Sequence, residues 1–182
     1  MSDYSISIVF PSVSSEDAER IGQDLLQWLQ AERVLGSELQ DCVLGRPEGY
    51  PPGENYVAAT DEPDEFLQTL QTNGAELITK RTVFDTGGNG FEIVCPSCSK
   101  AIEDLKPWGE AVDEWFTAAG PGMLACPNCP STRAVTDWTY EPPFGFANLG
   151  ITFWNWPDFA PAFLEAIASR VGHVPHIVYS SV

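Results

Sequence analysis

Two short cysteine pairs constrain this chain more than any other feature. They are Cys95-Pro96-Ser97-Cys98 and Cys126-Pro127-Asn128-Cys129, with 27 residues between them. Two residues between ligands let one tight turn place both sulfurs on the same ion, and Zn²⁺ favours four thiolates at the corners of a tetrahedron. The spacing therefore predicts one shared metal site. Its expected ligands are Cys95, Cys98, Cys126 and Cys129.

Three chemistries compete for these four thiols. Because every position is a cysteine and none is left for water, we expect a closed, structural zinc site. The same sulfurs also accept iron as in rubredoxin, and only the identity of the metal separates the two. Dithiol redox chemistry is the third alternative, although two matched pairs suit a shared ion better. Structural disulfides are disfavoured because the first residues lack the basic and apolar regions of a secretory signal, so we expect a cytoplasmic protein.

The two pairs resemble the Cys-Pro-x-Cys knuckles of zinc ribbons and rubredoxins. The resemblance covers residues 91–140 and implies a zinc-ribbon subdomain there. A glycine commonly follows the second cysteine in those families, whereas Ser99 and Pro130 stand at these positions here. Pro130 has no N–H to donate to a sulfur, so we expect the second knuckle to depart more from the family geometry.

Both ends of the chain have the same pattern of strand, proline-marked turn and amphipathic helix. Residues 4–10 alternate as a strand does, and residues 18–34 have apolar side chains at helical spacing after a capping box of Ser14 and Asp17. Near the other end we expect a strand over 151–156, a helix stopped by Gly172 and a strand over 176–179. With a strand that begins near Glu76, these elements predict an α+β fold. We expect a ferredoxin-like βαββαβ sandwich with an inserted zinc ribbon.

The middle of the chain supplies the elements that lead to the cysteines. Residues 61–65 are acidic around Pro63, which predicts a solvated helix start followed by the apolar Phe66, Leu67 and Leu70. Strands over 76–84 and 91–94 flank a glycine-rich turn, and we expect them to form a hairpin that leads into Cys95. A short helix over 108–116 and a strand over 133–140 complete the inserted segment.

These patterns predict two domains. Residues 1–90 and 141–182 form a discontinuous α+β sandwich domain, and residues 91–140 form the inserted zinc-ribbon subdomain. Residues 36–59 fit the scheme least. Their glycine, proline and tyrosine content predicts a long ordered loop over one face, a length that is uncommon unless functional.

Charge narrows the possible functions. Acidic residues outnumber basic ones 26 to 9, which gives a net charge of −17. A protein of this charge repels phosphate backbones and anionic lipids, so we expect neither nucleic acid nor a membrane as a partner. No P-loop, dinucleotide or hydrolase motif occurs. We therefore expect a non-catalytic protein-binding module with a basic protein partner. One form would be an inhibitor or immunity-type protein that masks a basic nuclease or toxin.

The alternative is an enzyme or small-ligand-binding protein with a pocket between the 36–59 loop and the aromatic strand 151–156. In a strand, Trp154 and Trp156 point to the same face. If helices cover that face, the two side chains belong to the hydrophobic core, and if they do not, the side chains form the wall of a ligand-binding pocket. We favour the core. A second metal site at His173 and His176 would need carboxylates from elsewhere, and we favour surface or partly packed histidines. Cys42 is expected to be a small buried hydrophobe.

Overall fold

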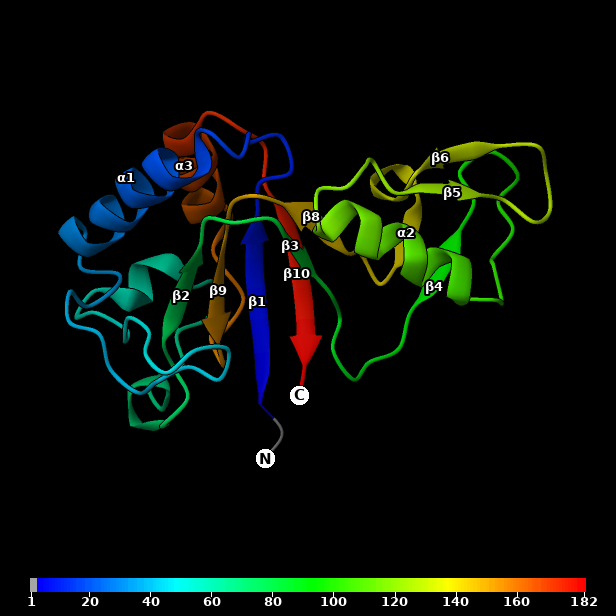
Figure 1. The fold of residues 1–182 in the computed structure, drawn as a ribbon. Coiled ribbons are helices and arrows are strands. Elements are labelled where there is room, and N and C mark those ends of the chain that lie inside the picture. The colour runs from blue at the N-terminus through cyan, green and yellow to red at the C-terminus, as the bar shows by residue number, and fades with distance from the viewer. Residues whose placement is uncertain (1–2) are drawn as a thin grey trace.

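A four-stranded antiparallel sheet with two helices on one face is the largest part of the fold (Figure 1). The computed structural model describes residues 3–182, in which helices and antiparallel strands give an α+β architecture. The strand order is β10-β1-β9-β2. The strands are β1 (Tyr4–Val9), β2 (Ala75–Ile78), β9 (Gly150–Trp154) and β10 (His176–Ser181). The α-helices are α1 (Ala18–Ala31), α2 (Lys106–Phe116) and α3 (Pro161–Val171).

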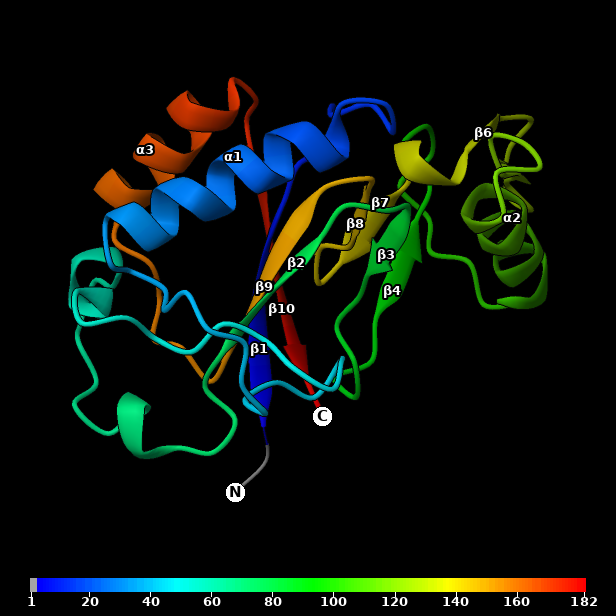
Figure 2. The same ribbon diagram turned by 60° about the vertical axis from the view of Figure 1, so that its left-hand side comes forward.

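Three two-stranded ladders and three 3-10 turns make up the other regular elements of the described chain. The ladders are β3 (Thr82–Phe84) with β8 (Gly145–Ala147), β4 (Glu92–Val94) with β7 (Thr139–Glu141), and β5 (Met123–Ala125) with β6 (Thr132–Ala134). The 3-10 turns are η1 (Tyr56–Ala59), η2 (Leu67–Thr69) and η3 (Val135–Asp137). Figure 2 shows β3, β4, β7, β8 and α2 to one side of the four-stranded sheet.

The alternation of strand residues gives the sheet two different faces. Ile6 and Ile8 lie in the main core under α1 and α3, and each such buried side chain contributes on the order of 2 kcal/mol. The helices meet each other where Trp28 stacks on Phe163. On the opposite face, Ser7 shares a 2.8 Å hydrogen bond with Thr152. β3 and β8 cover part of that face, so both faces of the sheet are packed.

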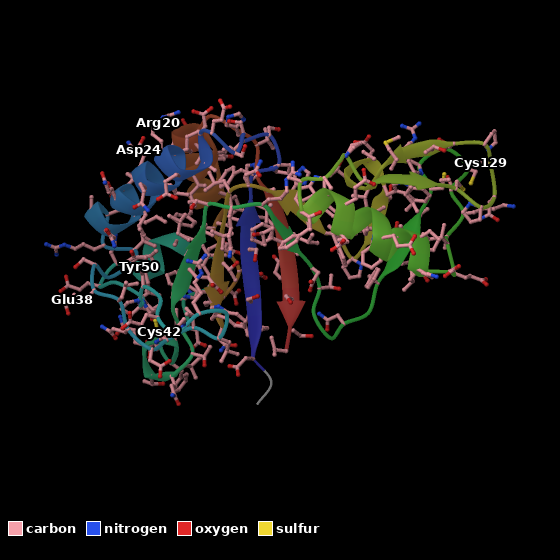
Figure 3. All side chains as sticks on the ribbon, viewed as in Figure 1. Arg20, Asp24, Glu38, Cys42, Tyr50 and Cys129 are labelled. Carbon is pink, nitrogen blue, oxygen red and sulfur yellow. The ribbon has the colours of Figure 1, made fainter. Side chains whose placement is uncertain are left out.

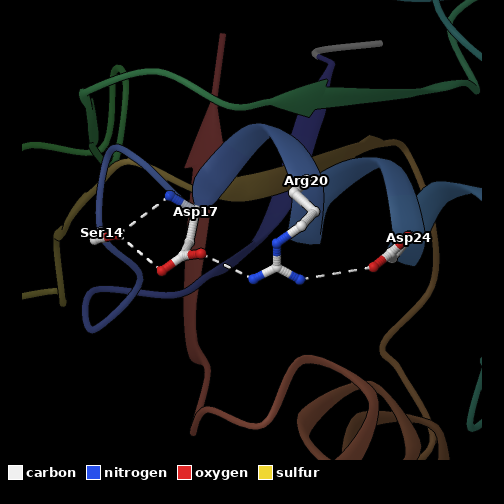
Figure 4. Close-up of polar contacts among 4 residues, drawn as sticks. All are labelled: Ser14, Asp17, Arg20 and Asp24. Atoms are coloured by element: carbon white, nitrogen blue, oxygen red, sulfur yellow. Dashed lines mark hydrogen bonds and ion pairs between the residues drawn. The ribbon is translucent and has the colours of Figure 1, made fainter.

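The predicted capping box forms one turn before α1 (Figure 4). The Asp17 N–H donates to Ser14 Oγ over 3.1 Å, and this hydroxyl in turn donates to the Asp17 carboxylate. Arg20 bridges Asp17 and Asp24 along the exposed side of the helix. All three side chains are more than half exposed, so these ion pairs add little stability.

A second hydrophobic cluster, separate from the main core, surrounds α2. Its central side chains are Ile93, Trp115, Leu124, Val135 and Tyr140. Phe144 and Phe146 also belong to this cluster, although they lie beyond the predicted subdomain limit at residue 140. The second core therefore extends along the return strand as far as β8.

The predicted hairpin of residues 76–84 and 91–94 is wrong. β3 pairs with β8 and β4 pairs with β7, so each strand pairs with the returning chain instead of with its neighbour in sequence. The glycine-rich turn instead docks on the end of β10, where the Gly88 N–H donates to the Ser181 carbonyl over 2.8 Å. The predicted strand over 133–140 is likewise divided into β6, η3 and β7.

Two further local predictions are corrected. The acidic residues 61–65 precede the single 3-10 turn η2 and not a longer helix, and Phe66 is 72% exposed. Trp154 and Trp156 do not share a face, because Asn155 has a positive φ of 59° that ends the alternation. Trp156 consequently turns into the main core beside Phe153, with ring centroids 4.9 Å apart.

Residues 36–59 form the predicted ordered loop, apart from η1. Tyr50 and Ala75 exchange two backbone hydrogen bonds of 2.8 Å, so the loop covers the outer edge of β2. Cys42 and Val43 pack against Trp154 on the face of the sheet opposite α1 and α3. Over residues 3–182, no helix has the length and apolar character needed to cross a membrane.

Candidate metal centre

The structure brings the four predicted cysteines together. All four sulfur atoms lie within 4.8 Å of one another, and the described chain has no second such cluster of Cys, His, Asp or Glu. The sulfurs of Cys95 and Cys129 are 3.8 Å apart, as are those of Cys98 and Cys126. Each of these distances joins one pair of the sequence to the other. The two pairs therefore meet at a single centre, as the spacing predicted.

The sulfur positions fit a four-coordinate metal ion. With metal–sulfur bonds of about 2.3 Å, the edge of a regular tetrahedron is about 3.8 Å, which is the distance found for both cross pairs. A disulfide would need about 2.0 Å between sulfurs, and all four cysteines are free thiols. The donor set fits zinc or iron better than magnesium or calcium, because thiolates are soft ligands.

Each cysteine pair lies at the tip of a β-hairpin. β4 leads into Cys95, and the chain returns through a bridge between Val94 and Ala101. β5 leads into Cys126, and β6 returns after the second pair. In both tips the N–H of the first cysteine donates across the turn, from Cys95 to the Lys100 carbonyl over 3.0 Å and from Cys126 to the Ser131 carbonyl over 2.9 Å. The two tips thus share one backbone pattern.

Backbone N–H groups point at the sulfurs of the first tip. Burial raises the pKa of the Cys95 thiol, but donation from the Ser97 and Cys98 N–H groups, together with hydrogen bonds from the neighbouring thiols of Cys126 and Cys98, lowers this pKa to about 6. A thiol with such a pKa is largely deprotonated at neutral pH, which is the form that binds a metal.

The second tip keeps its N–H donors despite Pro130. The Asn128 N–H donates to Cys126 Sγ over 3.3 Å. The Ser131 N–H, one residue beyond the proline, donates to Cys129 and lowers the pKa of this thiol, yet burial and the three neighbouring thiols raise it to about 11. The crowded sulfurs therefore resist full ionisation by themselves, and a divalent cation would remove this repulsion.

The two tips differ at the residue that follows the second cysteine. Ser99 has a φ of +57°, the left-handed conformation that glycine adopts readily. It therefore takes the conformation expected of the glycine in the resembling families. Pro130 has its φ fixed near −65° by its ring and cannot do so. The two tips therefore differ in the backbone conformation available to the residue after the second cysteine.

The cluster lies at the far side of the second core from the four-stranded sheet. Cys95 and Cys126 are buried in that core, and Cys98 and Cys129 are half-buried at its border. Figure 3 shows Cys129 at the far end of this part and Cys42 at the opposite end of the molecule. Cys42 is 5% exposed, and burial raises the pKa of its thiol, as expected of a small buried hydrophobe.

The other candidate residues do not gather into a second metal site among residues 3–182. His173 is half-buried and His176 is exposed. Phe153, Trp154 and Trp156 are each at most 7% exposed, so the aromatic strand is packed. A cavity of about 440 Å³ does lie beside the 36–59 loop, but α1 and β2 form its other walls.

No protein-family model matches the chain, and no curated protein or solved structure matches it. What the chain itself defines is an α+β protein with a four-cysteine cluster suited to a metal ion.

Proposed function

We propose that the four cysteines hold a structural Zn²⁺ ion in a zinc-ribbon subdomain. The 3.8 Å distances between sulfurs of different pairs carry this proposal, because they equal a tetrahedral edge around a four-thiolate ion. Four protein ligands fill the coordination sphere, so the ion would stabilise the two hairpin tips and would not activate water. The remaining chain would be a ferredoxin-like βαββαβ sandwich, which the order β10-β1-β9-β2 supports.

Metal analysis of the purified protein tests the zinc proposal. Native mass spectrometry of protein made in ordinary medium should give one zinc per chain. Cys95→Ser and Cys126→Ser should lose the metal, whereas Cys42→Ser, the matched control, should retain it. Iron in the wild-type protein, or a metal content that both ligand variants preserve, would contradict the assignment.

We further propose that the protein acts by binding a basic protein and not by catalysis, in a cytoplasmic setting that keeps thiols reduced. The net charge of −17 carries this proposal. The ion pairs of the described chain engage only Asp17, Asp24, Glu54 and Glu76, so most carboxylates face solvent without a paired cation. A field of this sign accelerates encounter with a positively charged partner. An inhibitor or immunity-type role would follow from masking such a partner.

A partner identified by capture and then purified tests this function. Its isoelectric point should be basic, and its association rate with this protein should fall at least about tenfold as ionic strength rises from low to physiological. The dissociation rate, measured in the same experiments as a control, should change much less with ionic strength. An acidic partner, association independent of salt, or a small molecule copurified at one per chain would overturn the proposal.

A further inference from the structure

A cavity at the N-terminal end of β1 has the features of a receptor for one cationic side chain. Its volume is about 420 Å³, and we refer to it as the Phe66 cavity. Its lining includes Tyr4, Asp64, Phe66, Leu70, Thr72 and Asn155. They come from β1, from the segment before β2 and from the end of β9, so three distant parts of the chain meet there.

Hydrogen bonds hold the walls of the Phe66 cavity in place. Asn155 accepts the Tyr4 N–H over 3.0 Å and donates to the Thr72 carbonyl over 2.8 Å, so it ties two walls together. The Tyr4 hydroxyl donates to the Trp156 carbonyl over 2.9 Å. A site that is already ordered costs less free energy to occupy.

The acidic rim is fixed as well. The Tyr56 hydroxyl donates to the Asp64 backbone carbonyl over 2.9 Å, and one carboxylate oxygen of Asp64 accepts the Phe66 N–H over 2.8 Å. Only one oxygen of the carboxylate is used in this turn. The other is available to a ligand at the rim.

An unusually exposed aromatic side chain lies on the same rim. Phe66 is 72% exposed, while its neighbour Leu67 is fully buried, so the local turn presents the Phe66 ring to solvent. Tyr4, also on the wall, is 41% exposed. Exposed aromatic rings beside a cavity are typical of the anchor points in protein interfaces.

The charge around the Phe66 cavity is negative. Asp3 and Asp64 line it, and no lysine or arginine does so among residues 3–182. The Asp61 N–H donates to the Asp158 carbonyl over 2.9 Å, which brings the acidic segment 61–65 beside another aspartate. Burial and then the charges of Asp64 and Asp158 raise the pKa of Tyr4, so both carboxylates act on this wall.

We propose that the Phe66 cavity receives an arginine side chain of the basic protein partner, an inference that rests on the proposed function. The alkyl stem would lie against Tyr4 and Leu70, and the guanidinium would stack on Phe66 and meet the free oxygen of Asp64. Arginine fits this combination because its planar, weakly hydrated cation both stacks on aromatic rings and pairs with carboxylates.

Peptide titration tests the cavity directly. The probe is the blocked tripeptide Gly-Arg-Gly, followed by amide chemical shifts of the full chain at physiological ionic strength. Shifts should concentrate at residues 64–72 and 155, and the citrulline peptide, which lacks the charge, should produce none. Asp64→Asn, which keeps the acceptor of the Phe66 N–H, and Phe66→Ala should each weaken binding about tenfold, while Glu110→Gln on the exposed side of α2 should not.

Several outcomes would overturn the assignment. These are shifts spread over the acidic surface, wild-type affinity for the arginine peptide in both cavity variants, and equal binding of the arginine and citrulline peptides. The purified partner separates this failure from that of the proposed function. If the partner is basic and binds Asp64→Asn and Phe66→Ala as tightly as wild type, only the cavity assignment fails. If the peptide binds as expected but no basic protein does, the proposed function fails, and of the inference only the affinity of the cavity for an arginine side chain stands.

Discussion

At the scale of single residues, Ser99 holds the first cysteine tip in a conformation that most side chains avoid. Its φ of +57° costs a non-glycine residue about 1 kcal/mol or more. The Ser99→Gly variant should therefore unfold with an equal or higher free energy and retain its metal. Ser99→Val, with a branched side chain, should lower the free energy of unfolding by about 1–2 kcal/mol.

Denaturant titration of the metal-loaded proteins measures this difference. Ser37→Val is the matched control, since Ser37 is exposed and its φ is not positive. If Ser99→Val were as stable as Ser37→Val, the left-handed conformation of Ser99 would not affect the free energy of unfolding.

Two glycines of the turn after β3 allow two costs of substitution to be measured separately, the cost of an unfavourable backbone conformation and the cost of a steric overlap. Gly87 and Gly90 both have positive φ, at 60° and 70°, so alanine costs a similar conformational free energy at either site. Only at Gly87 would the added Cβ overlap the Ser181 carbonyl, because nothing lies near Gly90. Gly87→Ala should therefore lower the free energy of unfolding by about 1–3 kcal/mol more than Gly90→Ala. Equal losses would mean that the turn does not dock on β10 in solution.

Asn155 shows why residue geometry was harder to predict than residue chemistry. The alternation expected for 151–156 holds as far as Trp154 and ends at the positive φ of Asn155. Hydrogen bonds to Tyr4 and Thr72, more than 80 positions away in sequence, hold this conformation. A local pattern contains no information about such partners, so the expectation that Trp154 and Trp156 share one face is wrong, although both are buried.

At the scale of elements, the terminal strands and helices were predictable and the pairing of the short strands was not. α1 and α3 each bury one face against the sheet, and helical spacing marks that face in the sequence. β3 and β4 have only three residues each. Their partners β8 and β7 come much later in the sequence, after the cysteine-containing segment, so no local pattern predicts the pairing. The four cysteines were predictable because their spacing reflects coordination chemistry. The Phe66 cavity was not, since its walls meet only in the fold.

Tyr140 links β7 to the rest of the second core. Its hydroxyl donates to the Val135 carbonyl over 2.8 Å and accepts from Trp108 Nε1 over 3.1 Å. Burial raises the pKa of Tyr140 well above its ordinary value, whereas the unfolded chain titrates near 10. Above about pH 10 the unfolded state binds fewer protons than the native state, so the free energy of unfolding should fall as pH rises.

Unfolding measured between neutral and alkaline pH tests this dependence, and the ultraviolet absorbance of tyrosinate follows the ionisation. Tyr140→Phe should reduce the alkaline slope, and at neutral pH it should lose about 1–3 kcal/mol because a buried acceptor and donor lose their partner. An unchanged slope in Tyr140→Phe would show that other groups cause the alkaline loss.

At the scale of the whole molecule, the two separate cores predict two units of stability. None of the four cysteines of the metal centre belongs to the main core, and the two cores share no residue. Cys95 and Cys126 are part of the second core itself. Metal binding and the folding of a small metal-bound unit are linked, so removing the ion should loosen the second core first. The sheet of β10, β1, β9 and β2 should remain folded.

Hydrogen exchange read by mass spectrometry, before and after treatment with a thiol-competitive chelator such as phenanthroline, distinguishes the two units. Amides of residues 91–140 should lose protection, those of β1 and β9 should keep it, and added Zn²⁺ should restore the original pattern. Cys95→Ser should resemble the chelated protein without treatment, and Cys42→Ser should resemble the untreated one. Simultaneous loss of protection in the sheet would mean that both cores form one cooperative unit, which would contradict the predicted division at residues 91–140.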